Sequence, residues 1–251
     1  MQTITGLDDM DRLADFFRHI SNSTEIGEAI KVFIKIMRTN SFSESIIIIK
    51  KVTGQSPIVQ VIQRVNIVTK RTDSLTVLES LLDVTKTTKI QDANTILKEL
   101  VPKHPSMNIL DILQQIRIKS GHDDIIDFFK QLCKYTGTKT IQQAWVVITR
   151  VTKITDILDL FTNLRKFTKV DFIQFITTVI RITRTTTFQE AIEKINKVTN
   201  ASHIVEALEI IYNIIHVDVI AFFTKIFSYS KTIEFEEIIT IIKKYTKTTC
   251  E

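Results

Sequence analysis

Apolar side chains recur along the chain at helical spacing, and residues 123–138 show the pattern within one unit. If Asp123 is position 1, then positions 3, 6, 7, 10 and 13 are Ile125, Phe128, Phe129, Leu132 and Tyr135. Steps of three and four residues return to one face of an α-helix, whereas one face of a strand needs alternation. The unit therefore predicts one helix of roughly 11–12 residues.

The same unit recurs about every 16 residues, and we count 15 copies, the first starting at residue 8 and the last at residue 233. Polar residues mark the ends of each copy. Asp124 at position 2 suits a helix N-cap, and Gly137 at position 15 suits the left-handed conformation that ends a helix. Position 10 is apolar in every copy: Phe17, Phe33, Ile49, Val65, Leu81, Leu97, Ile116, Leu132, Ile148, Leu164, Val179, Ile195, Ile211, Ile226 and Ile242.

The repeat predicts an all-α fold with well over half of the residues helical and no sheet. Turns of about four residues favour antiparallel neighbouring helices. Helices this short, rich in Ile, Val and Thr, are marginal alone and need burial against their neighbours. We expect a two-layer α-solenoid with a 32-residue helix pair, stacked in sequence order; a compact, closed wrap of the same helices is the alternative.

The array is expected to form a single domain over residues 1–251. Its one clear irregularity is the segment 101–106, VPKHPS, which carries two of the three prolines. This segment is interpreted as a longer loop or a slight bend, and the alternative is a hinge or a partner-binding loop.

Composition places the chain in the folded globular class, with 44% apolar and 24% charged residues. No apolar run reaches the length of a membrane span, and the start lacks the features of a signal peptide. Cys133 and Cys250 form no disulfide framework, which favours an intracellular chain. Against this, Asn22 and Asn200 begin glycosylation sequons, which we attribute to chance.

Catalytic motifs are not found: the sequence has no Gly-rich phosphate loop, GxSxG, HExxH or CxxC. His122, Asp123 and Asp124 resemble a metal-binding group, but they lie at a helix start, where a capping aspartate is expected. We therefore expect no catalytic residue, no metal site, no cofactor and no small-molecule site.

Basic residues follow a regular pattern in a chain of net charge +5. Regularly spaced cations could follow a phosphate backbone. Equally, bases at helix ends and acids at helix starts complement the helix dipole, and each basic end would neighbour an acidic start. The candidate contacts are position 12 of five consecutive units, Lys134, Arg150, Lys166, Arg181 and Lys197, with Lys153, Lys169 and Arg184 at position 15.

Three functions fit these observations. The first is a non-catalytic scaffold or protein-interaction module, since helical repeats present extended surfaces. The second is nucleic-acid binding through the basic positions, and the third is a self-assembling shell or filament subunit. Apolar residues at the predicted surface, Ile47 and Val146 among them, belong either to a second helix layer or to an interface.

Overall fold

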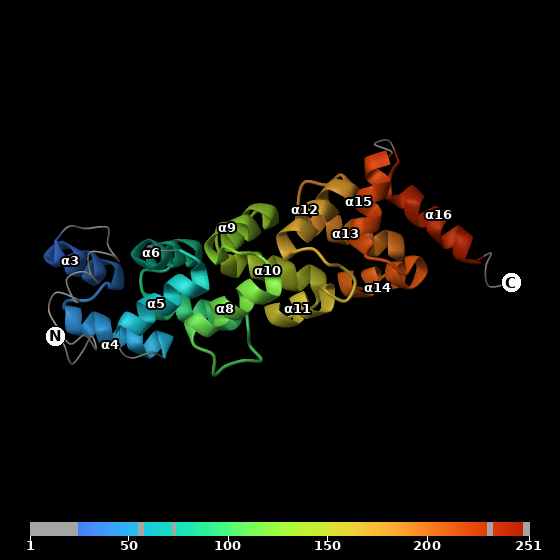
Figure 1. Cartoon of the computed structure of the whole chain (residues 1–251). Coiled ribbons are helices and arrows are strands. Elements are labelled where there is room, and N and C mark those ends of the chain that lie inside the picture. The colour runs from blue at the N-terminus through green and yellow to red at the C-terminus, as the bar shows by residue number, and fades with distance from the viewer. Residues whose placement is uncertain (1–24, 55–57, 72–73, 230–232, 248–251) are drawn as a thin grey trace. The chain divides into compact units, whose positions relative to one another are not determined.

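A computed structural model describes residues 25–54, 58–71, 74–229 and 233–247. These residues contain 14 helices and no strand, and 75% of them are helical, which confirms the all-α prediction. The first predicted unit, residues 8–23, lies outside the described part. The helices, labelled in Figure 1, are α3 (Ile26–Met37), α4 (Phe42–Thr53), α5 (Ile58–Thr69), α6 (Ser74–Thr85), α7 (Ile90–Glu99), α8 (Ile109–Ser120), α9 (Ile125–Thr136), α10 (Ile141–Thr152), α11 (Ile157–Leu164), α12 (Phe172–Thr183), α13 (Phe188–Thr199), α14 (Ile204–Ile215), α15 (Val219–Tyr229) and α16 (Phe235–Lys247).

Each described helix begins at position 3 of a predicted unit, and before several of them the side chain at position 2 caps the helix. Asp171 accepts the Gln174 N–H before α12, as a capping side chain should. Thr187 and Glu190 form a reciprocal capping box before α13, in which each side chain accepts the backbone N–H of the other residue. Before α3 and α7, position 2 makes no side-chain cap bond.

Most helices end where position 15 takes the left-handed conformation, and non-glycine residues occupy most of these positions. A residue with a Cβ is strained there, and glycine is not. The residues in this conformation are Arg38, Gly54, Lys70, Lys86, Gly121, Gly137, Lys153, Arg184, Asn200 and His216.

Two glycine substitutions are expected to have opposite effects on stability. Gly137 has φ +68° and nothing within 4 Å of an added Cβ, so Gly137→Ala meets only backbone strain. We expect it to lower the free energy of unfolding by about 1–2 kcal/mol. Gly27 has equally open space but lies inside α3, and Gly27→Ala should raise stability by about 0.5–1 kcal/mol. Urea denaturation of both variants measures the difference, and equal shifts would contradict the assigned helix end.

Buried threonines at position 14 close the last turn of many helices. The hydroxyl donates to the carbonyl of position 10, as Thr183 does to Val179 at 2.6 Å. This bond satisfies the polar atom of a side chain that the helix packing buries. The same contact is made by Thr53, Thr69, Thr85, Thr136, Thr152, Thr168 and Thr199.

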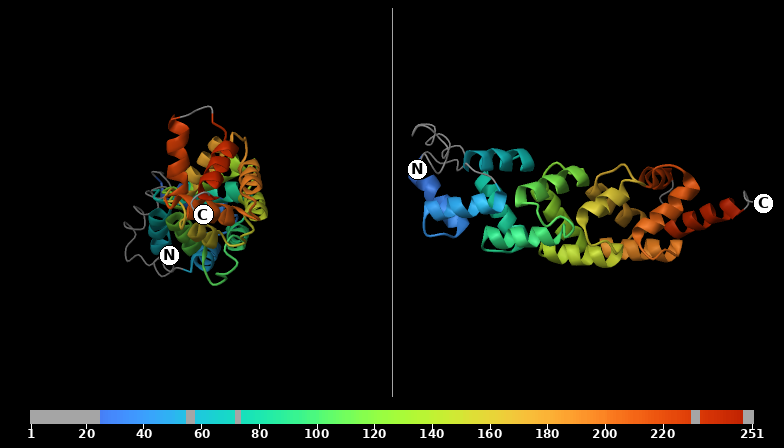
Figure 2. Two further views of the ribbon diagram at one scale, coloured as in Figure 1. Left: turned by 90° about the vertical axis from the view of Figure 1, so that its right-hand side faces the viewer. Right: turned by 90° about the horizontal axis from the view of Figure 1, so that it is seen from below.

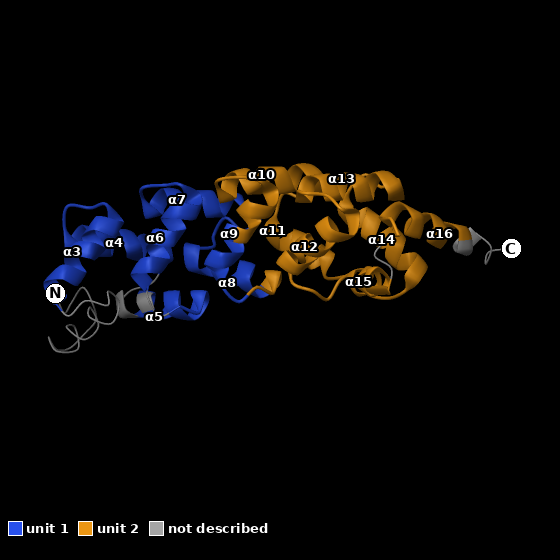
Figure 3. Cartoon of the chain, turned by 90° about the horizontal axis from the view of Figure 1, so that it is seen from above, with its two compact units in different colours: residues 1–118, 123–130 blue, residues 119–122, 131–251 orange. Residues whose placement is uncertain are grey.

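The described residues divide into two compact units, coloured in Figure 3. The first comprises residues 1–118 and 123–130, and the second comprises residues 119–122 and 131–251. The single domain expected from the sequence remains a prediction. The segment 101–106 lies within the first unit, where Val101 is buried and the Lys98 ammonium donates to the Pro105 carbonyl at 3.1 Å.

In the first unit, helices pack on their chain neighbours and also on the helix three further along. Consecutive contacts link α3 to α4, α4 to α5, α5 to α6 and α6 to α7. In addition, α3 contacts α6, and α4 contacts α7. An ion pair of 2.6 Å between Arg64 and Asp111 joins α5 to α8 in the same way. Position 10 is buried in each of the helices α3 to α8, for example Phe33 in α3 and Leu97 in α7.

The second unit repeats this arrangement. Contacts link α10 to α13, α11 to α14, α12 to α15 and α13 to α16. Its core holds a cluster of four rings in which Phe172 lies 5.0 Å from Phe161 and 6.2 Å from Phe175, measured between centroids. Phe188 closes the cluster at 6.3 Å from Phe172. Figure 2 gives two further views of the helices and their short connections.

The turn between α14 and α15 differs from the antiparallel reversal expected for neighbouring helices. The two helices meet at an angle of 71°, where a single residue separates the left-handed His216 from Asp218, which caps α15. Within the described residues no single helix is long and apolar enough to cross a membrane. This bent pair meets those criteria of length and composition only when both helices are taken together.

Candidate functional site

All eight basic residues singled out from the sequence belong to the second unit, and all eight are exposed. They do not form one continuous row of free cations, because several of their side chains are engaged with other residues. Lys134 lies over the Tyr135 ring, 5.4 Å from its centroid. The Arg150 guanidinium donates to the Gln189 side chain at the start of α13.

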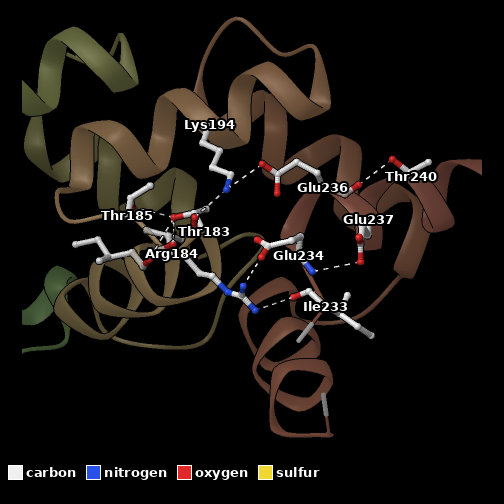
Figure 4. A network of polar contacts seen from close by, with 11 residues as sticks. Thr183, Arg184, Thr185, Lys194, Ile233, Glu234, Glu236, Glu237 and Thr240 are labelled. Carbon is white, nitrogen blue, oxygen red and sulfur yellow. Dashed lines mark hydrogen bonds and ion pairs between the residues drawn. The ribbon is translucent and has the colours of Figure 1, made fainter. Parts of the chain in front are cut away.

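Arg184 is part of a polar network, drawn in Figure 4, that fastens α12 and α13 to α16. Its guanidinium forms an ion pair with Glu234. Nearby, the Lys194 ammonium donates to the Thr183 carbonyl at 3.0 Å and lies 2.9 Å from a Glu236 carboxylate oxygen. Arg184 therefore has an intramolecular role that the sequence pattern left open.

Contacts of this kind recur, because the end of a helix meets the start of the helix four further along. In three of the five pairs a basic residue at a helix end neighbours an acidic residue at a helix start, which fits the dipole interpretation. The pairs are Gly54 with Asn108, Arg71 with Asp124, Gly121 with Asp171, Lys169 with Asp218 and Arg184 with Glu234.

Three of the eight, Lys153, Arg181 and Lys197, make no ion pair or side-chain hydrogen bond with any described residue. Two others, Lys166 and Lys169, are brought together at a surface hollow of about 340 Å³. Arg165, Tyr212 and His216 line the same hollow. The sequence pattern did not single them out, because it was a pattern of Lys and Arg at positions 12 and 15: Arg165 and Tyr212 occupy position 11, and His216 is a histidine at position 15.

The group His122, Asp123 and Asp124 serves the start of α9, as the capping interpretation predicts. Asp124 accepts the backbone N–H groups of Ile126 and Asp127 through one oxygen. Its other oxygen lies 2.7 Å from an Arg71 nitrogen. No three His, Cys, Asp or Glu residues in the described ranges are close enough to hold a metal ion.

The same contacts set the acidity of Asp124. Burial by itself would raise the pKa of this carboxyl. The hydrogen bond from Arg71 and those from the backbone outweigh burial and hold the pKa below its ordinary value of 3.8. In α16, the Lys194 ammonium likewise outweighs burial and lowers the pKa of Glu236.

Acid is therefore expected to destabilise the protein through these carboxylates. A group whose folded pKa is depressed stabilises the fold above its unfolded pKa, and this stabilisation is lost as pH falls through the folded value. The melting temperature should fall between about pH 5 and pH 3. Arg71→Gln should make this fall smaller, because the Asp124 pKa moves toward its unfolded value.

Lys70→Gln is the matched control for Arg71→Gln. It removes the adjacent cation, whose partner Asp123 is exposed, and exposed pairs contribute little. Thermal melts of both variants across this pH range measure the difference. A fall in the Arg71→Gln variant as large as that in the unmodified chain would contradict the role given to Arg71.

Several apolar side chains of the helices are exposed. Ile47 on α4 and Ile67 on α5 are each 67% exposed, and Val146 on α10 is 62% exposed. The structure therefore answers the question left by the sequence for Ile47 and Val146, since no second helix layer buries them. Trp145, next to Val146, is buried in the core.

The remaining sequence features have little chemical context. Cys133 is half-buried and forms no disulfide with a described residue, and Cys250 lies outside the described residues. Asn200 is exposed at the left-handed end of α13, while Asn22 lies outside the described residues. No protein-family model, curated protein or solved structure matches the chain.

Proposed function

We propose that the chain is a non-catalytic helical-repeat scaffold that binds a protein partner through exposed helix faces. The observation that carries this proposal is the exposure of Ile47 and Val146 in the middle of their helices and of Ile67 in the last turn of α5. Water covers about two-thirds of each side chain, so folding gains little from them. Burial against a partner would gain roughly 25 cal/mol for each Å² of apolar surface removed from water.

The proposed architecture is an α-solenoid within each unit, with three helices to a turn. Its support comes from the contacts between helices three apart, such as α10 with α13 and α12 with α15. Three sequence repeats of about 16 residues each make a solenoid turn of roughly 48 residues, in place of the 32-residue helix pair expected from the sequence. Such a turn repeats the same helix face at each level, and a partner could contact several levels.

The direction of stacked helices supports the same proposal. Lys194 on α13 reaches Glu236 near the start of α16, while Lys243 near the end of α16 reaches the Val198 carbonyl at 2.8 Å. The contact nearer the C-terminus of α13 is also the one nearer the C-terminus of α16, so the two helices run parallel. Strict alternation of antiparallel helices would make helices three apart run in opposite directions.

Capture of partners by the full chain tests the scaffold function. Ile47→Ser and Val146→Ser, made separately, remove exposed apolar surface from one helix in each unit. The matched controls are Glu79→Ser and Thr162→Ser, which alter exposed polar residues at the same position of their units. Quantitative mass spectrometry should find a defined set of proteins retained by the controls and lost with at least one apolar variant.

Identical recoveries from all four variants would reject these faces as the binding surface. Sedimentation velocity of the purified chain distinguishes the self-assembling alternative. If the chain forms concentration-dependent oligomers that Val146→Ser dissociates, its partner is another copy of itself rather than a different protein.

A further inference from the structure

The surface hollow of about 340 Å³ in the second unit is formed by two segments far apart in sequence. One is the chain after α11, from Arg165 to Lys169, and the other is the turn between α14 and α15, with His216, Val217 and Asp218. Tyr212, on the last turn of α14, also lines it. The volume falls in the range of pockets that hold a small ligand or one unit of a polymer.

The first segment is cationic and follows the early end of α11. Most helices run for 12 residues, but α11 ends at Leu164 after 8. The chain then continues in tight turns, with the Phe167 and Thr168 N–H groups both donating to the Leu164 carbonyl at 3.0 Å. This non-helical segment carries Arg165, Lys166 and Lys169, and all three line the hollow.

Three contacts fix the walls of the hollow against each other. The Val219 N–H donates to the Phe167 carbonyl at 3.0 Å. The Phe167 and Tyr212 rings meet edge to face, with centroids 5.7 Å apart. The two Asp218 oxygens accept the backbone N–H groups of Lys169 and Ala221, at 2.5 and 2.7 Å. The hollow is therefore organised before any ligand arrives.

The charges around the hollow favour an anion. Asp218 is the one carboxylate among its lining residues, and its two oxygens are already occupied by backbone N–H groups. The Lys166 ammonium makes an exposed hydrogen bond with the Asn163 side chain at 2.9 Å, which water or a ligand oxygen can replace. The Lys169 ammonium and the His216 imidazole line the hollow as additional donors.

Half-buried aromatic rings accompany these cations. Phe167 and Tyr212 are each partly exposed and line the hollow. Cations that contact phosphates, next to rings against which bases stack, are the combination by which proteins bind single-stranded nucleic acid. A phosphorylated peptide would use the cations but has no planar base for the rings.

We propose that this hollow binds a nucleotide unit of single-stranded nucleic acid, with its phosphate at Lys166, Lys169 and His216 and its base against the Phe167 and Tyr212 rings. This function is separate from the proposed protein-binding faces, and it involves two of the eight basic residues rather than a continuous row of them. One phosphate contacted at the hollow should lower affinity about 2.6-fold between about 50 and 200 mM salt.

Fluorescence anisotropy of the full chain with labelled single-stranded DNA and RNA of about 12 nucleotides tests the proposal. The variant Lys166→Gln with Lys169→Gln should weaken binding about tenfold or more at low salt. The matched control, Lys153→Gln with Lys197→Gln, removes the same charge from exposed lysines outside the hollow and should change affinity less than about threefold. Circular dichroism verifies that both variants remain folded.

Competition identifies the ligand class. Unlabelled oligonucleotide should displace the probe at a concentration at least about fivefold lower than inorganic polyphosphate of equal phosphate content, because only the oligonucleotide has bases to stack. Equal weakening by the two double variants would overturn the proposal, since binding would then follow net charge. Absence of oligonucleotide binding would also overturn the proposal. This holds equally if a phosphoserine peptide binds instead and depends on Lys166 and Lys169.

Discussion

Phe188→Ala is expected to lower the free energy of unfolding by about 3–5 kcal/mol, the range for removing a buried ring. Phe188 is fully buried and lies 6.3 and 6.4 Å from the Phe172 and Phe175 rings, between centroids. Alanine would leave a cavity beside these rings and remove edge-to-face contacts as well as apolar burial. Urea denaturation followed by circular dichroism measures the loss.

Tyr229→Ala is the aromatic control for this experiment. Tyr229 ends α15 and is 81% exposed, so its removal should change stability by less than about 0.5 kcal/mol. Phe188→Leu, which keeps most of the apolar volume, should fall between the two. A loss below about 1 kcal/mol for Phe188→Ala would show that the four-ring cluster is not a tightly packed core.

Leu132→Ala is expected to cost about 2–5 kcal/mol, because Leu132 occupies position 10 of its unit and is fully buried in α9. Lys130 lies two residues earlier on the exposed face of the same helix, and Lys130→Ala should cost less than about 0.5 kcal/mol. Thermal or urea denaturation of the two variants makes the comparison. If they unfold alike, the register assigned to α9 is wrong.

The sequence by itself determined where the helices lie, because the signals involved are local. The alternation of apolar and polar residues at steps of three and four defines a buried face, and Leu132 and Phe188 lie on it. Side chains such as Asp171 and Thr187 can hydrogen-bond only to N–H groups two or three residues away, so they fix helix starts from sequence alone.

The early end of α11 could not be predicted from the same pattern. Leu164 is apolar at position 10 and Thr168 occupies position 14, as in a full-length unit. In the structure the chain after Leu164 instead turns tightly, and the Phe167 carbonyl is taken by Val219 from a distant segment. A contact made by residues about 50 positions apart leaves no trace in local periodicity.

Only the tertiary structure decided which helices meet. Short turns are equally compatible with reversal and with the 71° bend between α14 and α15, so helix spacing does not fix how helices stack. The long-range pairs, among them Arg71 with Asp124, follow from the packing of helices three and four apart. That packing also separates Arg184, held by Glu234, from Lys166 and Lys169, which share a hollow, although all three occupy similar places in the repeat. The partner that each basic side chain meets depends on contacts between distant segments, and local sequence does not determine it.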